Sequence, residues 1–229
     1  MILMLLFLLL SVQAVKIHLV TQIPPAATPQ RTQEYHYCLD RNLNLPEIHK
    51  VHLVTTLSLP EHIKVHSKLM LHKGIADMTI TSALRMAFNH TQENEIIIVA
   101  NADIYFDQTV RYLRYMRSSP WFLSRYEHYP LKGPLYIGTQ CDSSKYIGSH
   151  DAFIFRRPMP KIWLSTLDWA LGTPGMEARM IWELAQFGVK VENPCTLVRT
   201  WHVHYSRRNH RYRFPVVNTF KRSMLAWPK

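Results

Sequence analysis

The sequence predicts an α/β fold, a three-layer sandwich with a mainly parallel central sheet. Segments with the composition of strands alternate along the chain with segments of helical periodicity, which is the pattern of a sheet covered by helices on both faces. The stretch from Ile96 to Ala100 is wholly apolar and rich in β-branched residues, as expected for a strand that is buried on both faces. The 229 residues are enough for one full core, and no change in composition divides them.

The predicted elements follow one another along the chain. Strands are expected at 17–21, 51–55, 96–100, 121–126, 152–155, 189–192 and 197–204, and helices at 32–42, 79–90, 108–116 and 176–187. The second helix has one apolar face, made by Ile80, Ala83, Leu84, Ala87 and Phe88. Asp107 is expected to cap the third helix and Gly188 to end the last. Residues 127–149 are rich in turn-forming types and are expected to form a long loop.

The two ends of the chain differ from its body. Residues 1–14 are an uncharged apolar run closed by small side chains, which predicts a signal peptide or signal anchor. Residues 15–208 are then the folded domain and 209–229 a basic tail. Such a start predicts the secretory pathway (ER or Golgi lumen) or secretion, and offers a route to membrane association. The sequon Asn89-His90-Thr91 agrees with a glycoprotein in that compartment.

The charge of the chain narrows the class of partner that it can bind. The formal net charge is +11, and no acidic residue follows Glu192. This basic end predicts an anionic partner such as a nucleotide diphosphate or an acidic glycan, whereas a secretory start argues against nucleic acid.

The cysteines, Cys38, Cys141 and Cys195, are odd in number and lack metal-binding spacing. They allow one disulfide and one buried thiol, with the pairing left open.

The segment Asn101-Ala102-Asp103 directly follows the buried strand at 96–100. Ligands of open α/β sheets bind beyond the carboxyl ends of such strands. In an extended backbone the side chains of Asn101 and Asp103 point the same way, and paired oxygens suit Mg²⁺ or Mn²⁺. The alternative is that the segment only forms a turn or caps a helix.

Late in the chain, His202 and His204 alternate on a predicted strand, so both imidazoles are expected on one side.

Four features occur in order along the chain: 101–103, 149–155, 171–179 and 201–204. This order resembles glycosyltransferases of the GT-A fold over roughly residues 16–208. In that family an Asp-x-Asp motif binds a metal ion and the diphosphate of a nucleotide sugar. Asn101 stands in place of the first aspartate here, which leaves Asp103 as the firm carboxylate ligand.

The resemblance implies how the metal ion and the donor are held. Asp103 is the predicted metal ligand, and His204, with His202 as the second choice, completes the metal shell. Asn101 is expected to be a weaker ligand or to contact the sugar or the ribose. Arg31, just after a proline-rich loop, is expected to reach the diphosphate or the base.

Two further carboxylates are candidates for the acceptor side. Glu177 lies in the first turn of the helix at 176–187, where it is either the general base for an acceptor hydroxyl or merely a charge that suits the helix dipole. Asp151 is expected to hold a hydroxyl of the acceptor or of the donor sugar, the alternative being a turn cap. Glu183 is expected on another face of the helix, as a surface residue or salt-bridge partner.

The predicted function is therefore metal-assisted transfer of a sugar from a nucleotide-diphosphate donor to an acceptor hydroxyl. The cofactors would be Mn²⁺ or Mg²⁺ and the nucleotide sugar, and the acceptor a glycan, a protein or a small molecule. The alternative is a non-catalytic GT-A-like protein that binds a polyanion or a glycan through its basic end, where aromatic residues interleave with arginines.

Overall fold

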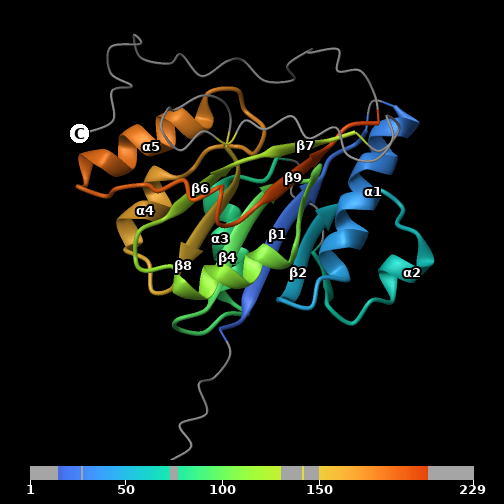
Figure 1. The fold of residues 1–229 in the computed structure, drawn as a ribbon, viewed down its shortest axis with the longest axis horizontal. Helices are drawn as coiled ribbons and strands as arrows, with labels where there is room; N and C mark the ends of the chain where they lie inside the picture. The colour runs from blue at the N-terminus through green and yellow to red at the C-terminus, as the bar shows by residue number, and fades with distance from the viewer. Residues whose placement is uncertain (1–14, 27, 73–76, 130–140, 142–149, 206–229) are drawn as a thin grey trace, which may run out of the picture.

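The computed structural model describes residues 15–26, 28–72, 77–129, 141 and 150–205 (Figure 1). The predicted signal segment, the basic tail and most of the predicted loop at 127–149 lie outside these residues. Among the helices that are described, none is both long enough and apolar enough to cross a membrane.

A six-stranded sheet forms the centre of the molecule. Its strands, in order across the sheet, are β3 (Leu69–His72), β2 (Ile48–Thr55), β1 (Ile17–Ile23), β4 (Ile96–Asn101), β8 (His150–Arg156) and β6 (Trp121–Ser124). The pairs from β3 to β4 are parallel, whereas β8 runs antiparallel to both of its neighbours. The sheet is thus mainly parallel, as the alternation of elements predicts.

Helices cover both faces of this sheet, which gives the predicted three layers. On one face α1 (Pro29–Leu43), α2 (Glu61–Lys64) and the 3₁₀ helix η1 (Gln108–Tyr115) pack in a cluster with β1 side chains such as Leu19. On the other face α3 (Ile80–Phe88), α4 (Lys161–Thr166) and α5 (Met176–Gln186) pack with the adjacent Val20. Successive residues of one strand therefore enter opposite cores, because side chains of a strand alternate between its faces.

A second, smaller sheet lies beyond the end of β4. Its order is β5 (Ile104–Phe106), β9 (Thr200–Val203) and β7 (Tyr126–His128), and Figure 1 shows β7 and β9 running together across the upper part of the molecule. Since β5 follows β4 after a two-residue turn, this sheet begins at the carboxyl edge of the central sheet. Glu127 and His202 of the candidate site lie on its strands, and Asp103, Arg125 and His204 directly flank them.

Some predicted elements differ from the observed ones. Residues 189–192 are not a strand: Glu192 makes an isolated bridge to Trp121, and the chain turns at 195–197 before the short β9. The predicted helix at 108–116 is a 3₁₀ helix. The strands β3 and β5 and the short helices α2 and α4 were not expected from the sequence.

The cysteines follow the pattern that their number allows. Cys141 and Cys195 form a disulfide, and Cys38 is a free thiol buried within α1. The disulfide joins the segment between β7 and β8 to the turn that precedes β9.

Candidate active site

Charged side chains form one connected group where β4 ends and the smaller sheet begins. This group is called the site network below. Its members are Arg31 and Glu34 of α1, Asp103 of the turn between β4 and β5, Arg125 and Glu127 at β7, Asp151 of β8, and His202 and His204 at β9. Parallel strands bring their carboxyl ends to one edge, so these residues, far apart in sequence, meet there.

The start of α1 positions Arg31. Pro29 occupies the beginning of the helix, where a missing N–H is tolerated, and the side chain of Thr28 accepts a hydrogen bond from the backbone N–H of Arg31. Arg31 then donates from Nη2 to Asp103 Oδ2 at 2.6 Å and pairs with Glu34. The structure thus brings together Arg31 and Asp103, both of which are predicted site residues.

His202 is the centre of the network because each of its ring nitrogens faces a carboxylate. In the smaller sheet it is paired with Ile104 on one side and Glu127 on the other. Its Nε2 lies 2.8 Å from Asp103 Oδ2, and its Nδ1 lies 2.8 Å from Glu127 Oε2. A neutral imidazole carries one N–H and can donate to only one of the two. The second contact therefore needs an additional proton or a bound cation.

His204 reaches the same carboxylate as His202. Its Nε2 contacts Glu127 Oε2, and the two imidazole rings lie 4.0 Å apart between centroids. Both imidazoles thus lie on one side of the chain, as strand alternation predicts. Burial alone would raise the pKa of the Glu127 carboxyl, but hydrogen bonds with His202 and His204 hold it well below its usual range.

Arg125 links Glu127 to Asp151. It donates from Nε to Glu127 Oε1 at 2.7 Å and from Nη1 to Asp151 Oδ2 at 2.5 Å. The other oxygen of Asp151 accepts a hydrogen bond from Asn101 Nδ2 at 2.9 Å. Asp151 therefore lies inside β8 with both carboxylate oxygens engaged.

Asn101 and Asp103 have different partners. The backbone is extended at Asn101 but turns at Ala102 and Asp103. The strand alternation that predicted parallel side chains therefore does not apply to this pair. Asn101 is directed to Asp151, whereas Asp103 is directed to Arg31 and His202. Asp107 caps η1 as predicted, by accepting a hydrogen bond from the backbone N–H of Thr109.

Glu177 lies in the first turn of α5, as predicted. The residue before this helix is Gly175, whose φ of 82° lies in the left-handed region that glycine adopts without strain. Burial raises the pKa of Glu177 to about 7, and the negative charge of nearby Asp151 adds to the rise while Arg125 opposes it. A carboxylate with such a pKa is suited to accept a proton near neutral pH. Glu183 pairs with Arg179 on the same helix, as expected.

The donor set of the network fits a divalent cation. One atom each from Glu127, His202 and His204 lies within 4.8 Å of the other two, and carboxylates and imidazoles are the ligands that Mn²⁺ accepts. The network joins four carboxylates to two guanidinium groups, which leaves two formal negative charges when the imidazoles are neutral. A doubly charged ion would balance them.

Sequence reasoning missed Glu127 and Arg125. Both follow the apolar strand Trp121–Ser124, at positions where the sequence predicted the end of a strand and the start of a loop. The available signal was a pair of opposite charges two residues apart, directly after a buried strand. At 101–103 the signal was a different one, an amide and a carboxylate two residues apart after a buried strand, and the sequence correctly placed that segment at the edge of the sheet.

Comparisons with known proteins give the fold. The mannosyltransferase PcManGT from Pyrobaculum calidifontis, solved with GDP-Man and Mn²⁺, matches at a TM-score of 0.50 and 12% identity over 86% of this chain and 58% of its own. Residues 1–349 of S. aureus TarS, solved with UDP-GlcNAc, match at a TM-score of 0.52 and 8% identity over 85% of this chain and 60% of their own. The match thus spans less than two thirds of each of these proteins.

Sequence comparison adds nothing to this result, because no family model and no curated protein matches the chain. At 8–12% identity the structural likeness concerns the fold. Both neighbours are nucleotide-sugar transferases with the mixed α/β architecture described above, built on a mainly parallel sheet. The chain therefore has a GT-A-like fold of the nucleotide-diphospho-sugar transferase type.

Proposed function

We propose that this chain is a glycosyltransferase that moves a sugar from a nucleotide-diphosphate donor to an acceptor hydroxyl, with a divalent ion such as Mn²⁺ or Mg²⁺. The observation that carries the proposal is the environment of His202, which has a carboxylate oxygen 2.8 Å from each ring nitrogen at the edge of a GT-A-like sheet. Such an arrangement favours a cation. An ion bound there would neutralise negative charge on the departing diphosphate.

Glu127, His202 and His204 are the proposed ligands of this ion, because their donor atoms converge. With His202 Nδ1 directed to the ion, its Nε2–H donates to Asp103 Oδ2, and this hydrogen bond fixes the tautomer and the orientation of the ring. Asp103, predicted from the sequence as a ligand, would then act on the metal through His202. The alternative, in which Asp103 itself binds the ion, is distinguished by the variants below.

Arg31 is the proposed contact to the donor diphosphate. Its side chain is 25% exposed although it is tied to Asp103 and Glu34, so the guanidinium is both fixed in place and open to a ligand. A planar guanidinium binds phosphate oxygens in pairs. Asn101, at the same sheet edge, remains the candidate contact to the sugar or the ribose.

Glu177 is the proposed general base. Burial raises its pKa to about 7, so near neutral pH this carboxylate is suited to accept a proton from an acceptor hydroxyl. Asp151 already accepts a hydrogen bond from Arg125 on one carboxylate oxygen and from Asn101 on the other. Asp151 is therefore better suited to hold Arg125 and to orient a hydroxyl than to remove its proton.

The test is a panel of nucleotide sugars offered to the full chain with and without Mn²⁺. Calorimetry measures donor binding, and release of UDP or GDP measures turnover. We expect one donor class to bind in a Mn²⁺-dependent manner and to be slowly hydrolysed without an acceptor. Failure of every donor to bind in the presence of Mn²⁺ would overturn the proposal. Tight retention on heparin alongside that failure would favour the non-catalytic binder.

Two conservative variants separate the roles in the network. His204→Gln removes a proposed ligand and should abolish Mn²⁺-dependent donor binding. Asp103→Asn keeps a side-chain oxygen that can accept from His202 Nε2, so Mn²⁺ affinity should fall only about 10- to 100-fold, as for other outer-shell partners. Complete loss in Asp103→Asn would show that Asp103 binds the ion directly. Glu183→Gln on α5 is the control and should leave Mn²⁺ affinity unchanged.

A further inference from the structure

A row of histidines crosses three neighbouring strands of the central sheet, away from the site network. In the sheet register Val20 is paired with His52, and His72 is paired with Val54. His18, His52 and His72 are thus each displaced by two residues from one strand to the next. Val20 and Val54 pack on the face that α3 covers, and a spacing of two keeps His18 and His52 on that same face.

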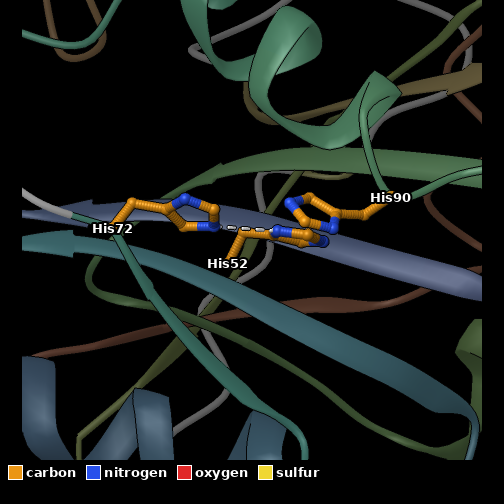
Figure 2. Close-up of side chains that lie close together, drawn as sticks. All are labelled: His52, His72 and His90. Carbon is orange, nitrogen blue, oxygen red and sulfur yellow. Dashed lines mark hydrogen bonds between the residues drawn. The ribbon is translucent and has the colours of Figure 1, made fainter.

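Two residues of this row, His52 and His72, converge with His90 on one point. His52 Nδ1 lies 3.1 Å from His72 Nε2. The ring centroid of His90, in the segment after α3, lies 5.2 Å from the ring centroid of His52 and 5.9 Å from that of His72. Figure 2 shows the three rings turned toward one another. One nitrogen from each of the three lies within 4.8 Å of the others. These three residues are called the histidine cluster below.

The spacing of the nitrogens matches a tetrahedral metal site. Zinc binds imidazole nitrogen at about 2.0–2.1 Å, so two such ligands in tetrahedral geometry lie about 3.3 Å apart. The observed separation of 3.1 Å between His52 and His72 needs only a small opening to reach this value. His90 closes the third side with a movement of its exposed side chain.

His18 and Glu95 already orient the ring of His52. Its Nε2 lies 3.0 Å from His18 Nδ1, and His18 Nε2 lies 3.4 Å from Glu95 Oε2. If His52 Nδ1 binds a metal, its Nε2–H donates to His18, and His18 Nε2–H is directed to the carboxylate. Metal-bound histidines commonly donate their other N–H to such a partner, which fixes the tautomer and strengthens the ligand.

From this geometry we propose that His52, His72 and His90 form a second metal site, specific for a transition-metal ion such as Zn²⁺. Three imidazoles favour Zn²⁺ over Mg²⁺ or Mn²⁺, which prefer oxygen ligands. The site shares no residue with the site network, where carboxylates contribute. His72 is half-buried and His90 exposed, so an ion reaches the cluster from solvent and keeps a position for water.

The test uses the tag-free full chain, stripped with a chelator and then titrated with Zn²⁺. Bound zinc is counted after dialysis, and Co²⁺ in place of Zn²⁺ reports tetrahedral geometry by its visible spectrum. His90→Ala and His72→Ala remove the two accessible ligands without opening the core. His62→Ala, an exposed histidine of α2, is the matched control. Each cluster variant should bind one zinc ion fewer per chain than wild type, and His62→Ala should bind the same number.

Thermal melting gives a second readout. Zn²⁺ should raise the Tm of wild type by more than it raises the Tm of either cluster variant, because an ion that binds only the folded state stabilises it. Mn²⁺-dependent donor binding should be the same in His90→Ala as in wild type, which separates this site from the site network. An unchanged zinc count in both cluster variants would overturn the proposal, as would absence of zinc from the wild-type chain.

Discussion

Glu177 offers the sharpest test at the scale of a single residue. Its carboxyl has a pKa of about 7 because it is partly buried, with the negative charge of Asp151 nearby. As a general base it must be deprotonated, so the transfer rate of wild type should rise with pH and level off above about 7. In Glu177→Gln we expect donor binding to persist while the rate falls about 10²- to 10⁴-fold and loses this dependence on pH.

The control for Glu177 lies on the same helix. Glu183 is paired with Arg179 at 2.5 Å, and Glu183→Gln should leave both the rate and its pH profile unchanged. If Glu177→Gln turned over at the wild-type rate, Glu177 would be only a charge at a helix start, which is the alternative that its position in the first turn also allows.

The sequence predicts the positions of some site residues correctly and does not predict those of others. Asp103 and His202, 99 positions apart, meet at 2.8 Å, and both are expected at the site because each follows or ends an apolar strand. The contact between Glu127 and His202 depends instead on the register of β7 with β9, a long-range pairing that local patterns do not encode. The turn at Ala102 likewise depends on where β5 pairs, and it sends Asn101 and Asp103 to different partners.

Strands and helices with a strong local pattern are predicted correctly. The helix at 79–90 and the strand at 96–100 have clear periodicities, and α3 and β4 match them within two residues. The segment at 189–192 has the composition of a strand but lies beside β6 with one bridge, because Asn193 and Pro194 then turn the chain toward β9. β3 is short and partly exposed, so its apolar pattern is weak, and pairing with β2 stabilises it instead.

The disulfide is an element-scale constraint on the site. Cys141 and Cys195 are 54 positions apart in the sequence. Cys195 lies five residues before β9, the strand that carries His202. Closing a loop of this length in the unfolded chain contributes about 4 kcal/mol in the chain-entropy view. Cys141→Ser together with Cys195→Ser should therefore lower the free energy of unfolding by up to about 4 kcal/mol, measured with urea.

Cys38 provides the comparison for this prediction. It is buried and forms no disulfide, so Cys38→Ala should lower the free energy of unfolding much less than loss of the disulfide does. A reducing agent should destabilise Cys38→Ala and wild type by the same amount. An unfolding curve that does not respond to loss of the disulfide would show that β9 is held by its pairing alone. The secretory location stays a prediction, and it would place this bond in an oxidising compartment, where disulfides persist.

The free energy of unfolding of the whole molecule depends on pH through buried histidines and through Glu177, which act in opposite directions. Burial lowers the pKa of His150 from 6.5 to about 4. The contribution of its neutral ring to the free energy of unfolding is therefore complete above pH 6.5 and is lost as the pH falls toward 4. At pH 5 this loss is about 2 kcal/mol, since each pKa unit is worth about 1.4 kcal/mol. His18 has a lowered pKa of about 4 and acts in the same direction.

Glu177 acts in the opposite direction. Its pKa is raised from 4.5 to about 7, so the folded state holds its proton more tightly and gains stability as the pH falls from 7 toward 4.5. In wild type this gain offsets part of the loss caused by the buried histidines. Glu177→Gln removes the gain and leaves the loss. With a chelator present, the variant should therefore lose more free energy of unfolding between pH 7 and pH 5 than wild type, as measured by urea titration, whereas Glu183→Gln should follow wild type. Equal losses in Glu177→Gln and wild type would mean that Glu177 titrates at its ordinary pKa, and the case for it as the base would fail with it.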